Sequence, residues 1–343
     1  MSTLRRDPVV GRWVINTDEL EKRTSIVEKP EVSESSPECP LCAGNEGSTP
    51  PELFAIRPDG SSPNSPGWEV RVVPNFSAAM QIGGELNRRA ELMYDLMDSI
   101  GTHELVIGSP EHVSNMADLP ESQFNRIFSA YRQRMLDLKT NPDLRSVFIY
   151  KSYGTESLLE SLSHTHSHIV ATPVTPKSIK EQYVGAKKYF QYKERCVYCD
   201  IVRQEIMQKK RIISSNAKFI AIAPFASKYS HEVWILPRTH NCDFENSPEK
   251  DFPYLSSILK EILLRIKAAL NNPPYNFALF SGPNKKGREG YWKTIDQDYH
   301  WHIEIMPIPK NLEGFEWATG FYLNDTTPET AAQKLREVKV RGY

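Results

Sequence analysis

The sequence predicts an α+β protein made of two copies of one unit, in which two strands, a helix and two further strands follow one another. Three observations support this duplication. Each half opens with a Cys-x-x-Cys pair, continues with an alternating strand that ends in proline, and then has a ten-residue segment that begins with His-Glu and ends in histidine. An amphipathic helix and two more strands complete each half.

The matching elements occur in the same order in both halves. Alternating apolar and polar residues predict the strands, and apolar residues spaced by three and four predict the helices. Asn-Pro follows each helix, and proline cannot continue it. The expected pairs are 68–76 and 218–226, 103–112 and 231–240, the helices 121–138 and 254–270, 146–150 and 276–280, and 166–173 and 300–307. Because 343 residues exceed what one core usually holds, we expect two domains, residues 1–190 and 191–343.

The composition is that of an ordinary soluble globular protein. Hydrophobic residues make up 39%, charged residues 25%, and the net charge is −1, so nothing attracts nucleic acid or anionic lipid. No run approaches the roughly 20 apolar residues of a membrane span, and the N-terminus lacks the apolar core of a signal peptide. We therefore expect a cytoplasmic protein with neither a nucleic-acid partner nor a membrane partner.

Four of the five cysteines form the pairs Cys39-x-x-Cys42 and Cys196-x-x-Cys199. In a reducing compartment this spacing indicates a metal site or a redox couple. Both pairs are expected in loop knuckles, which favours metal. One histidine after the second strand and one from the last strand complete two Cys₂His₂ sets suited to zinc, namely Cys39, Cys42, His112 and His164, and Cys196, Cys199, His240 and His300. His302 is an alternative to His300, and Cys242 is expected to be a partly buried apolar residue.

Residues 282–298 separate the last two expected strands. They are basic and then aromatic, which indicates a loop over a cleft or at a subunit contact. Lys285 and Lys286 are expected to be solvated, and the glycine at 282 lacks the spacing of a nucleotide-binding loop.

Three histidines, His164, His166 and His168, alternate before an apolar segment that ends at Pro173. On a strand this spacing places all three imidazoles on one face. If His164 holds zinc, His166 remains for chemistry, and we expect it to face an open pocket. A neutral imidazole with one nitrogen fixed by a hydrogen bond can act as a nucleophile through the other.

These motifs resemble the galactose-1-phosphate uridylyltransferase family, a branch of the histidine-triad superfamily. The similarity begins at residues 6–15, includes the first Cys pair, Ser109-Pro-Glu-His112 and the three histidines, and ends at 320–336. The second Cys pair, with Phe225 and Trp234, is most similar to the ADP-glucose phosphorylase branch. The resemblance implies a duplicated histidine-triad-like unit, an antiparallel half-barrel with flanking helices, and a homodimer.

The resemblance also implies roles for individual residues. His166 would be the nucleophile of nucleotidyl transfer. The implied substrate contacts are Ser161, His168 and Arg23 to the phosphates, Asn75 and Phe76 to the nucleoside, and Phe321 and Tyr322 to the sugar. Two of these positions depart from uridylyltransferases, which have glutamine at 168 and a Tyr-Glu pair at 321–322.

The most direct expectation is a zinc-containing nucleotidyltransferase of galactose metabolism. It would transfer a nucleoside monophosphate, first of all UMP from UDP-glucose, to a hexose 1-phosphate through a nucleotidyl-histidine. The alternative is a phosphorylase or hydrolase of an ADP-sugar or a dinucleoside polyphosphate that uses the same histidine. A zinc-stapled nucleotide-binding protein without catalysis is a third hypothesis.

Overall fold

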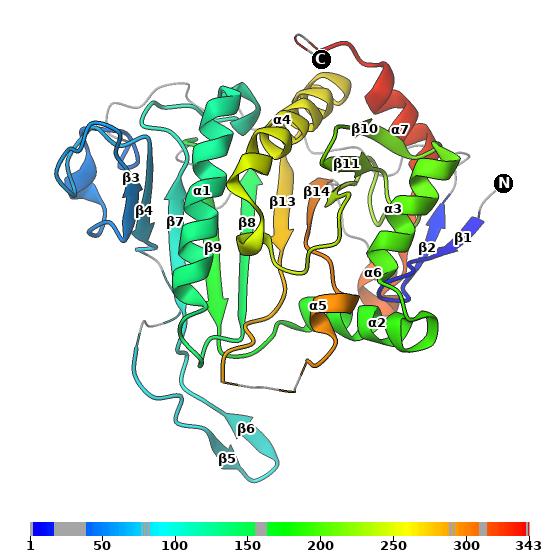
Figure 1. Ribbon diagram of the computed structural model, residues 1–343, viewed down its shortest axis with the longest axis horizontal. Coiled ribbons are helices and arrows are strands. Elements are labelled where there is room, and N and C mark those ends of the chain that lie inside the picture. The colour runs from blue at the N-terminus through cyan, green and yellow to red at the C-terminus, as the bar shows by residue number, and fades with distance from the viewer. Residues whose placement is uncertain are drawn as a thin grey trace.

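The computed structural model describes residues 3–16, 39–76, 78, 80, 83–154, 163–287, 290, 292–308, 314–340 and 342. Its main element is a ten-stranded antiparallel sheet with the order β10-β11-β12-β14-β13-β8-β9-β7-β4-β3 (Figure 1). The α+β class predicted from the sequence is confirmed. The ten strands are β3 (Phe54–Ile56), β4 (Val70–Pro74), β7 (Thr102–Ile107), β8 (Ser146–Tyr153), β9 (His166–Thr172), β10 (Ile212–Ser215), β11 (Phe219–Ile222), β12 (Val233–Pro237), β13 (Tyr275–Phe280) and β14 (His302–Pro307).

The duplication is visible in the strand order. Outward from the centre, β8-β9-β7-β4-β3 on one side repeats the arrangement β13-β14-β12-β11-β10 on the other. The two halves join where β8 and β13 pair antiparallel, from Tyr275 opposite Tyr153 to Leu279 opposite Ile149. Both halves therefore contribute to one continuous sheet, and the expected boundary at residue 190 falls within helix α2 (Lys177–Lys193).

Helices α1 (Glu121–Leu138) and α4 (Phe252–Ala269) lie side by side on one face of this sheet (Figure 1). Their apolar residues pack into one core with the inward residues of the strands, and Phe128 of α1 contacts Phe252 of α4 at 6.0 Å between ring centroids. Burying an aromatic side chain of this kind stabilises the fold by about 1.5–3 kcal/mol. Both helices occur within two residues of the ranges predicted from the three-and-four spacing.

One hydrogen bond establishes which face of β9 the helices cover. The buried Tyr131 hydroxyl of α1 donates to Ser167 Oγ at 2.5 Å. Because successive side chains of a strand alternate between faces, His166 and His168 lie on the opposite face from the helices.

Replacing Tyr131 by phenylalanine should lower the free energy of unfolding by about 0.5–1.5 kcal/mol, because the Ser167 hydroxyl loses its buried partner. Urea denaturation measures this change. Tyr192→Phe is the control, since Tyr192 is 80% exposed and should change stability by less than about 0.5 kcal/mol. Equal stability of the two variants would mean that the hydrogen bond does not orient β9.

Helices α2 and α3 (Val197–Gln208), a separate three-stranded sheet and several short elements complete the fold. Helices α2 and α3 pack on Ile220, Ile222 and Trp234, which point away from α4. A separate three-stranded sheet contains β15 paired in parallel with β2. The remaining elements are β1 (Thr3–Arg6), β2 (Trp13–Asn16), β15 (Tyr322–Asn324), the hairpin β5 (Arg89–Glu91) and β6 (Tyr94–Leu96), α5 (Ile295–Asp298), α6 (Gly314–Thr319), α7 (Pro328–Glu337), and the 3-10 turns Glu46–Ser48, Met116–Asp118, Phe244–Asn246 and Glu249–Asp251. Among the described helices, none has both the length and the apolar character needed to cross a bilayer.

Candidate active site and metal sites

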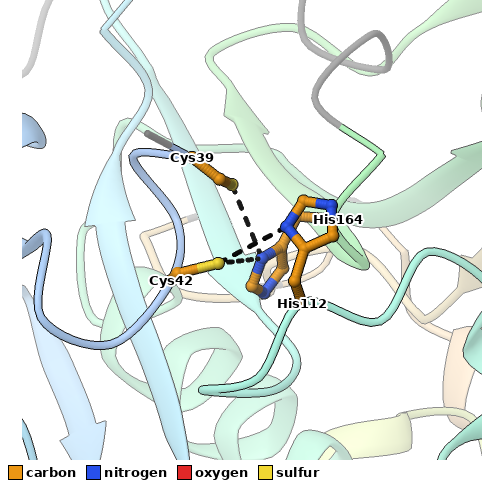
Figure 2. A group of neighbouring side chains, drawn as sticks. All are labelled: Cys39, Cys42, His112 and His164. Atoms are coloured by element: carbon orange, nitrogen blue, oxygen red, sulfur yellow. Dashed lines mark hydrogen bonds between the residues drawn. The ribbon is translucent and has the colours of Figure 1, made fainter. Parts of the chain in front are cut away.

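The first predicted metal set comes together between the Cys39–Cys42 turn, the segment after β7 and the segment before β9 (Figure 2). The Sγ atom of Cys42 lies 3.4 Å from His112 Nδ1 and 3.5 Å from His164 Nδ1, and Cys39 Sγ lies 3.7 Å from His164 Nδ1. Zinc bonds of about 2.3 Å to sulfur and 2.0–2.1 Å to nitrogen, at tetrahedral angles, separate S and N by about 3.5 Å. The four side chains therefore fit a tetrahedral metal ion.

The second set has the same geometry. Cys199 Sγ lies 3.4 Å from His240 Nδ1 and 3.6 Å from His300 Nδ1, and all four donor atoms of Cys196, Cys199, His240 and His300 lie within 4.8 Å of one another. His302 does not replace His300 in this group. The expectation of a loop knuckle is wrong here, because Cys199 lies in the first turn of α3, where a spacing of three residues keeps both thiols on one side.

Backbone carbonyls orient the imidazoles of both sets. His164 Nε2 donates to Ser109 O at 2.8 Å, and His240 Nε2 donates to Asp296 O at 2.9 Å. A carbonyl can only accept, so the proton is on Nε2 and the Nδ1 lone pair faces the thiols. This tautomer is the one that a metal ion requires.

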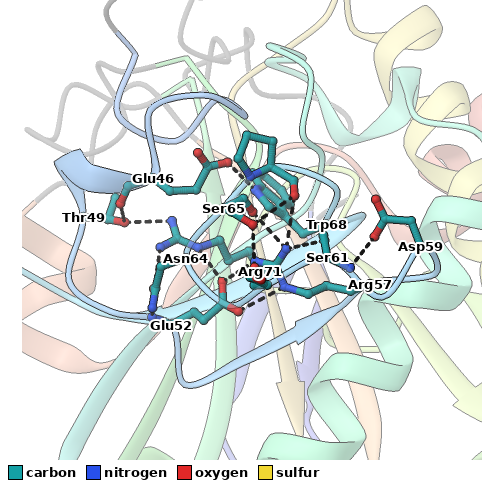
Figure 3. Close-up of polar contacts among 12 residues, drawn as sticks. Glu46, Thr49, Glu52, Arg57, Asp59, Ser61, Asn64, Ser65, Trp68 and Arg71 are labelled. Atoms are coloured by element: carbon teal, nitrogen blue, oxygen red, sulfur yellow. Dashed lines mark hydrogen bonds and ion pairs between the residues drawn. The ribbon is translucent and has the colours of Figure 1, made fainter.

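A buried polar network holds the first cysteine turn against the sheet (Figure 3). Trp68 Nε1 donates to Glu46 Oε1 at 2.7 Å, and the same carboxylate accepts the Gly44 N–H at 3.1 Å. The fully buried guanidinium of Arg71, on β4, donates to Glu52 at 3.0 Å. Because this network orders the turn without the metal, the thiols are already close together when an ion binds.

His166 is oriented by its own strand. Its Nδ1 lies 2.7 Å from the carbonyl oxygen of His164, which can only accept, so Nδ1 carries the proton and Nε2 carries the lone pair. The buried ammonium of Lys151 donates to the carbonyl of His166 at 2.8 Å. Ser163, which directly precedes His164, has a φ of 51°, and β9 begins only at His166. His164 therefore lies before the strand, and the expectation that all three histidines occupy it is wrong.

His168 belongs to a hydrogen-bonded chain that continues through His103 on β7. His168 Nδ1 lies 2.9 Å from His103 Nε2, and the Asn75 amide nitrogen lies 3.1 Å from both ring nitrogens of His103. His168 Nδ1 and His103 Nε2 therefore share one hydrogen, and the contact with Asn75 suits either nitrogen as its donor. Tyr150 stacks on His168 at 4.5 Å with an interplanar angle of 12°. The arrangement places the Nε2 lone pair of His166 beside the imidazole of His168.

Burial determines the charge of this histidine pair. Burial, with a contribution from the neighbouring imidazole, lowers the pKa of His103 to about 4. Burial, with a contribution from the Lys151 ammonium, lowers the pKa of His168 to about 4. Both imidazoles are therefore neutral near pH 7, which the donor–acceptor chain requires.

The same pKa values predict an acid-labile fold. The folded pKa values lie below the unfolded value of about 6.5, so between pH 6.5 and pH 4 the unfolded chain binds up to about two more protons, and stability falls as the pH falls. Urea titrations across this range measure the slope of the unfolding free energy against pH. In the variant His103→Gln/His168→Gln, this slope should be smaller by the equivalent of up to about two protons. An unchanged slope would show that the two imidazoles are not held neutral.

The expectation of an open pocket at His166 is wrong. The side chains of His166 and His168 are 2% and 3% exposed, and Nε2 of His166 is buried. A phosphorus atom has to come within about 3–3.5 Å of the nucleophile for attack. Attack by Nε2 would therefore require the structure to open at this point.

Comparisons with known proteins show the family of this chain. The sequence-family model described as galactose-1-phosphate uridyl transferase, C-terminal domain, matches residues 182–342 of this chain. An ADP-glucose phosphorylase from Arabidopsis thaliana is 31% identical over 348 residues, which cover 98% of this chain and 93% of that protein. The chain belongs to the galactose-1-phosphate uridylyltransferase family. Its predicted resemblance to this family, with the ADP-glucose phosphorylase branch, is thereby confirmed.

A further member of the family and a solved structure also match over the full length. A galactose-1-phosphate uridylyltransferase from Thermotoga maritima is 24% identical, with 99% of both chains covered. The crystal structure of the A. thaliana ADP-glucose phosphorylase with bound ADP-glucose has a TM-score of 0.80 and 28% identity, again with 99% of both chains covered.

Within this family fold, the second half has its own counterpart of His166. His302 Nδ1 lies 3.0 Å from the carbonyl of His300, a residue of the second metal set, as His166 lies against His164. Glu304 occupies the position of His168, and its carboxylate lies 3.4 Å from His302 Nε2 and 3.4 Å from the Lys228 ammonium. Although burial opposes ionisation, Lys228 and His302 hold the pKa of Glu304 at about 2. The second imidazole therefore faces a carboxylate, which would repel a phosphate.

The remaining family-derived positions are spread over the molecule. Asn75 is buried where β4 ends, and Phe76 is 46% exposed beside it. Phe321 and Tyr322 lie at the three-stranded sheet, where Tyr322 pairs with Val14 and packs on Tyr229, so they are not on the sheet that carries His166. Arg23 and Ser161 lie outside the described residues.

Sequence reasoning missed Lys151, Tyr150 and the role of His103. His103 was noticed as a repeat marker, and its position two residues before the buried Leu105 placed it on a definite face of β7. Its contact with His168 depends on strand pairing, with Leu105 opposite His168, which the sequence did not reveal.

Proposed function

We propose that this protein is a nucleotidyltransferase that takes a nucleoside monophosphate from a nucleoside diphosphate sugar onto His166 and passes it to a second acceptor. The observation that carries this proposal is the pair of imidazoles on β9, with the lone pair of His166 on Nε2 and the ring centroid of His168 5.2 Å from that of His166. The relatives, which include both uridylyltransferases and an ADP-glucose phosphorylase, support it.

The proposed reaction has two displacement steps. His166 Nε2 attacks the α-phosphorus, the bond to the bridging oxygen breaks, and sugar 1-phosphate leaves as the phosphoramidate forms. His168 Nε2–H donates to the phosphate oxygens, where negative charge accumulates. An oxygen of the acceptor phosphate then attacks the same phosphorus and regenerates the imidazole. The His164 carbonyl keeps the His166 ring aligned through both steps.

Two donor–acceptor pairs follow from the relatives. A uridylyltransferase would use UDP-glucose and a hexose 1-phosphate, and a phosphorylase would use ADP-glucose and inorganic phosphate. The higher identity to the ADP-glucose phosphorylase favours the second pair. The absence of a carboxylate at 321–322, where the sugar-contacting Tyr-Glu pair is expected, also favours it.

We further propose that both Cys₂His₂ sets hold zinc and that the enzyme is a homodimer. The donor set and the S···N separations support zinc, which would act as a structural ion that fixes the ends of the strands. The homodimer would explain how the exposed Phe321 side chain could contribute to substrate binding, since it lies away from His166 on the same chain.

Radiolabelled donors test the proposal. The protein is incubated with ADP-glucose or UDP-glucose labelled at the α-phosphorus, denatured in alkali, and examined for protein-bound label that acid releases. We expect label from ADP-glucose, chased to ADP by inorganic phosphate. Label from UDP-glucose, chased by galactose 1-phosphate, would instead identify the uridylyltransferase pair. If neither donor labels the protein, covalent transfer from these sugars is excluded.

A further inference from the structure

A cavity of about 690 Å³ lies at the far end of β9 from His166. β9 runs from His166 to Thr172, and the three residues after it, 173–175, line the cavity. Seven residues of strand at about 3.3 Å each separate the cavity from the imidazoles by roughly 20 Å. Residues of the β5–β6 hairpin line one side, and residues 283–285, 290, 292, 293 and 296 also line the cavity.

Positive charge dominates the lining of this cavity. Two carboxylates, Asp95 and Asp296, face six cationic side chains, which are Arg88, Arg89, Arg145, Lys180, Lys285 and Lys293. The net charge of −1 for the whole chain makes this concentration a local feature. Converging cations in a concave, partly shielded site attract anions more strongly than they would on an open surface.

Three of these cations are uncompensated within the described part of the chain. Arg89 pairs with Asp98 at 2.9 Å, and Lys285 pairs with Asp243 at 2.6 Å and also with Asp296, so the expectation that Lys285 is solvated is wrong. The side chains of Arg88, Lys180 and Lys293 form no ion pair with a described carboxylate. They come from three separate segments, the start of the hairpin, helix α2 and the 283–296 segment.

An aromatic ring adds to the binding surface. Trp292 lines the cavity, with the edge of Tyr183 at 5.7 Å and the Lys187 ammonium at 5.9 Å holding its ring. Arginine and lysine bind phosphate oxygens, and an indole ring offers a flat surface to a base or sugar.

We propose that this cavity is a second anion-binding site, separate from His166, that takes a small ligand carrying two or more phosphate groups. Its position gives such a ligand contact with both halves. Pro173 follows the strand of His166, and the backbone carbonyl of Asp296 accepts the Nε2–H of His240, a residue of the second metal set, at 2.9 Å.

Inorganic diphosphate is the probe, because it has the charge without the nucleoside or the sugar. Isothermal titration calorimetry compares the wild type with Lys180→Ala/Lys293→Ala, whose exposed side chains are not needed for folding. The matched control Lys177→Ala/Lys210→Ala removes the same charge from exposed positions outside the cavity. We expect at least a tenfold loss of affinity in the cavity variant and less than a twofold change in the control.

Two further measurements separate this site from the catalytic one. His166→Ala should keep the diphosphate site that the lysine variant loses, and diphosphate should change tryptophan fluorescence in the wild type but not in Trp292→Phe. Equal affinity in the cavity and control variants, or loss of all binding in His166→Ala, would overturn the proposal. Failure of millimolar diphosphate to bind the wild type would also overturn it.

Discussion

Replacing His166 by alanine should abolish nucleotidyl transfer, with kcat/KM lowered by about 10⁴-fold or more, because the variant has no group to form the covalent intermediate. The α-phosphorus label should disappear from the protein at the same time. The fold should persist, since the hydrogen bond that is lost runs within one segment, from His166 Nδ1 to the carbonyl of His164.

His302→Gln is the matched control for this prediction. His302 has the same buried position and the same hydrogen bond to the carbonyl two residues before it, but it faces the Glu304 carboxylate. This variant should bind label normally, with one nucleotidyl group per chain. Label that survives in His166→Ala, or that is lost in His302→Gln with the fold intact, would place the nucleophile elsewhere.

Removal of one thiol from each metal set should have unequal effects on activity. Cys42→Ser and Cys199→Ser should each lose one metal ion per chain and more than about 4 kcal/mol of unfolding free energy. Cys42→Ser should also lower kcat strongly, because the metal ion no longer helps to hold His164, whose backbone carbonyl orients His166. Cys199→Ser should leave kcat nearly unchanged below its unfolding temperature, because His300 orients His302 and not His166.

Elemental analysis, urea denaturation and steady-state kinetics on the same preparations measure these effects. Two metal ions per wild-type chain and one in each variant are expected. Full metal content in either serine variant would argue against that metal set. Equal kcat in the two variants would show that the first site does not position the nucleophile.

The metal sets could be predicted from sequence because their ligands are marked by chemistry that few other roles require. Two thiols three residues apart lie close together both in a tight turn and in one turn of a helix. The histidines could be added because the duplication gave two sets that supported each other. Helix α3, which starts at Val197 directly after Cys196, was missed, since the same spacing suits a loop or a helical turn.

The catalytic neighbours could not be predicted in the same way. His103 and Tyr150 meet His168 across strands that are far apart in the sequence, and their contact depends on register and ring orientation. The strand register also corrects the predicted alignment of the two halves. Leu105 lies opposite His168 and Trp234 lies opposite Glu304, so His103 corresponds to Glu232, and the expected match with His231 is shifted by one residue.

The alignment of the last strands needs a similar correction. The sequence paired His166 with His300, whereas the carbonyl hydrogen bonds pair His166 with His302 and His164 with His300. The correction explains why the second half lacks a nucleophilic pair. The Glu304 carboxylate occupies the position that corresponds to His168. The ring of Tyr198 on α3 lies 4.9 Å from the ring of His302.

The pairing of β8 with β13 at the centre of the sheet limits how this chain can be divided. If the two halves were expressed separately, each would expose a long hydrophobic edge strand to other molecules, and such edges promote aggregation. Phe128 of the first half would also lose Phe244 and Phe252 of the second. The second half therefore acts as a structural partner of the first, because its strand β13 covers the edge that β8 would otherwise expose.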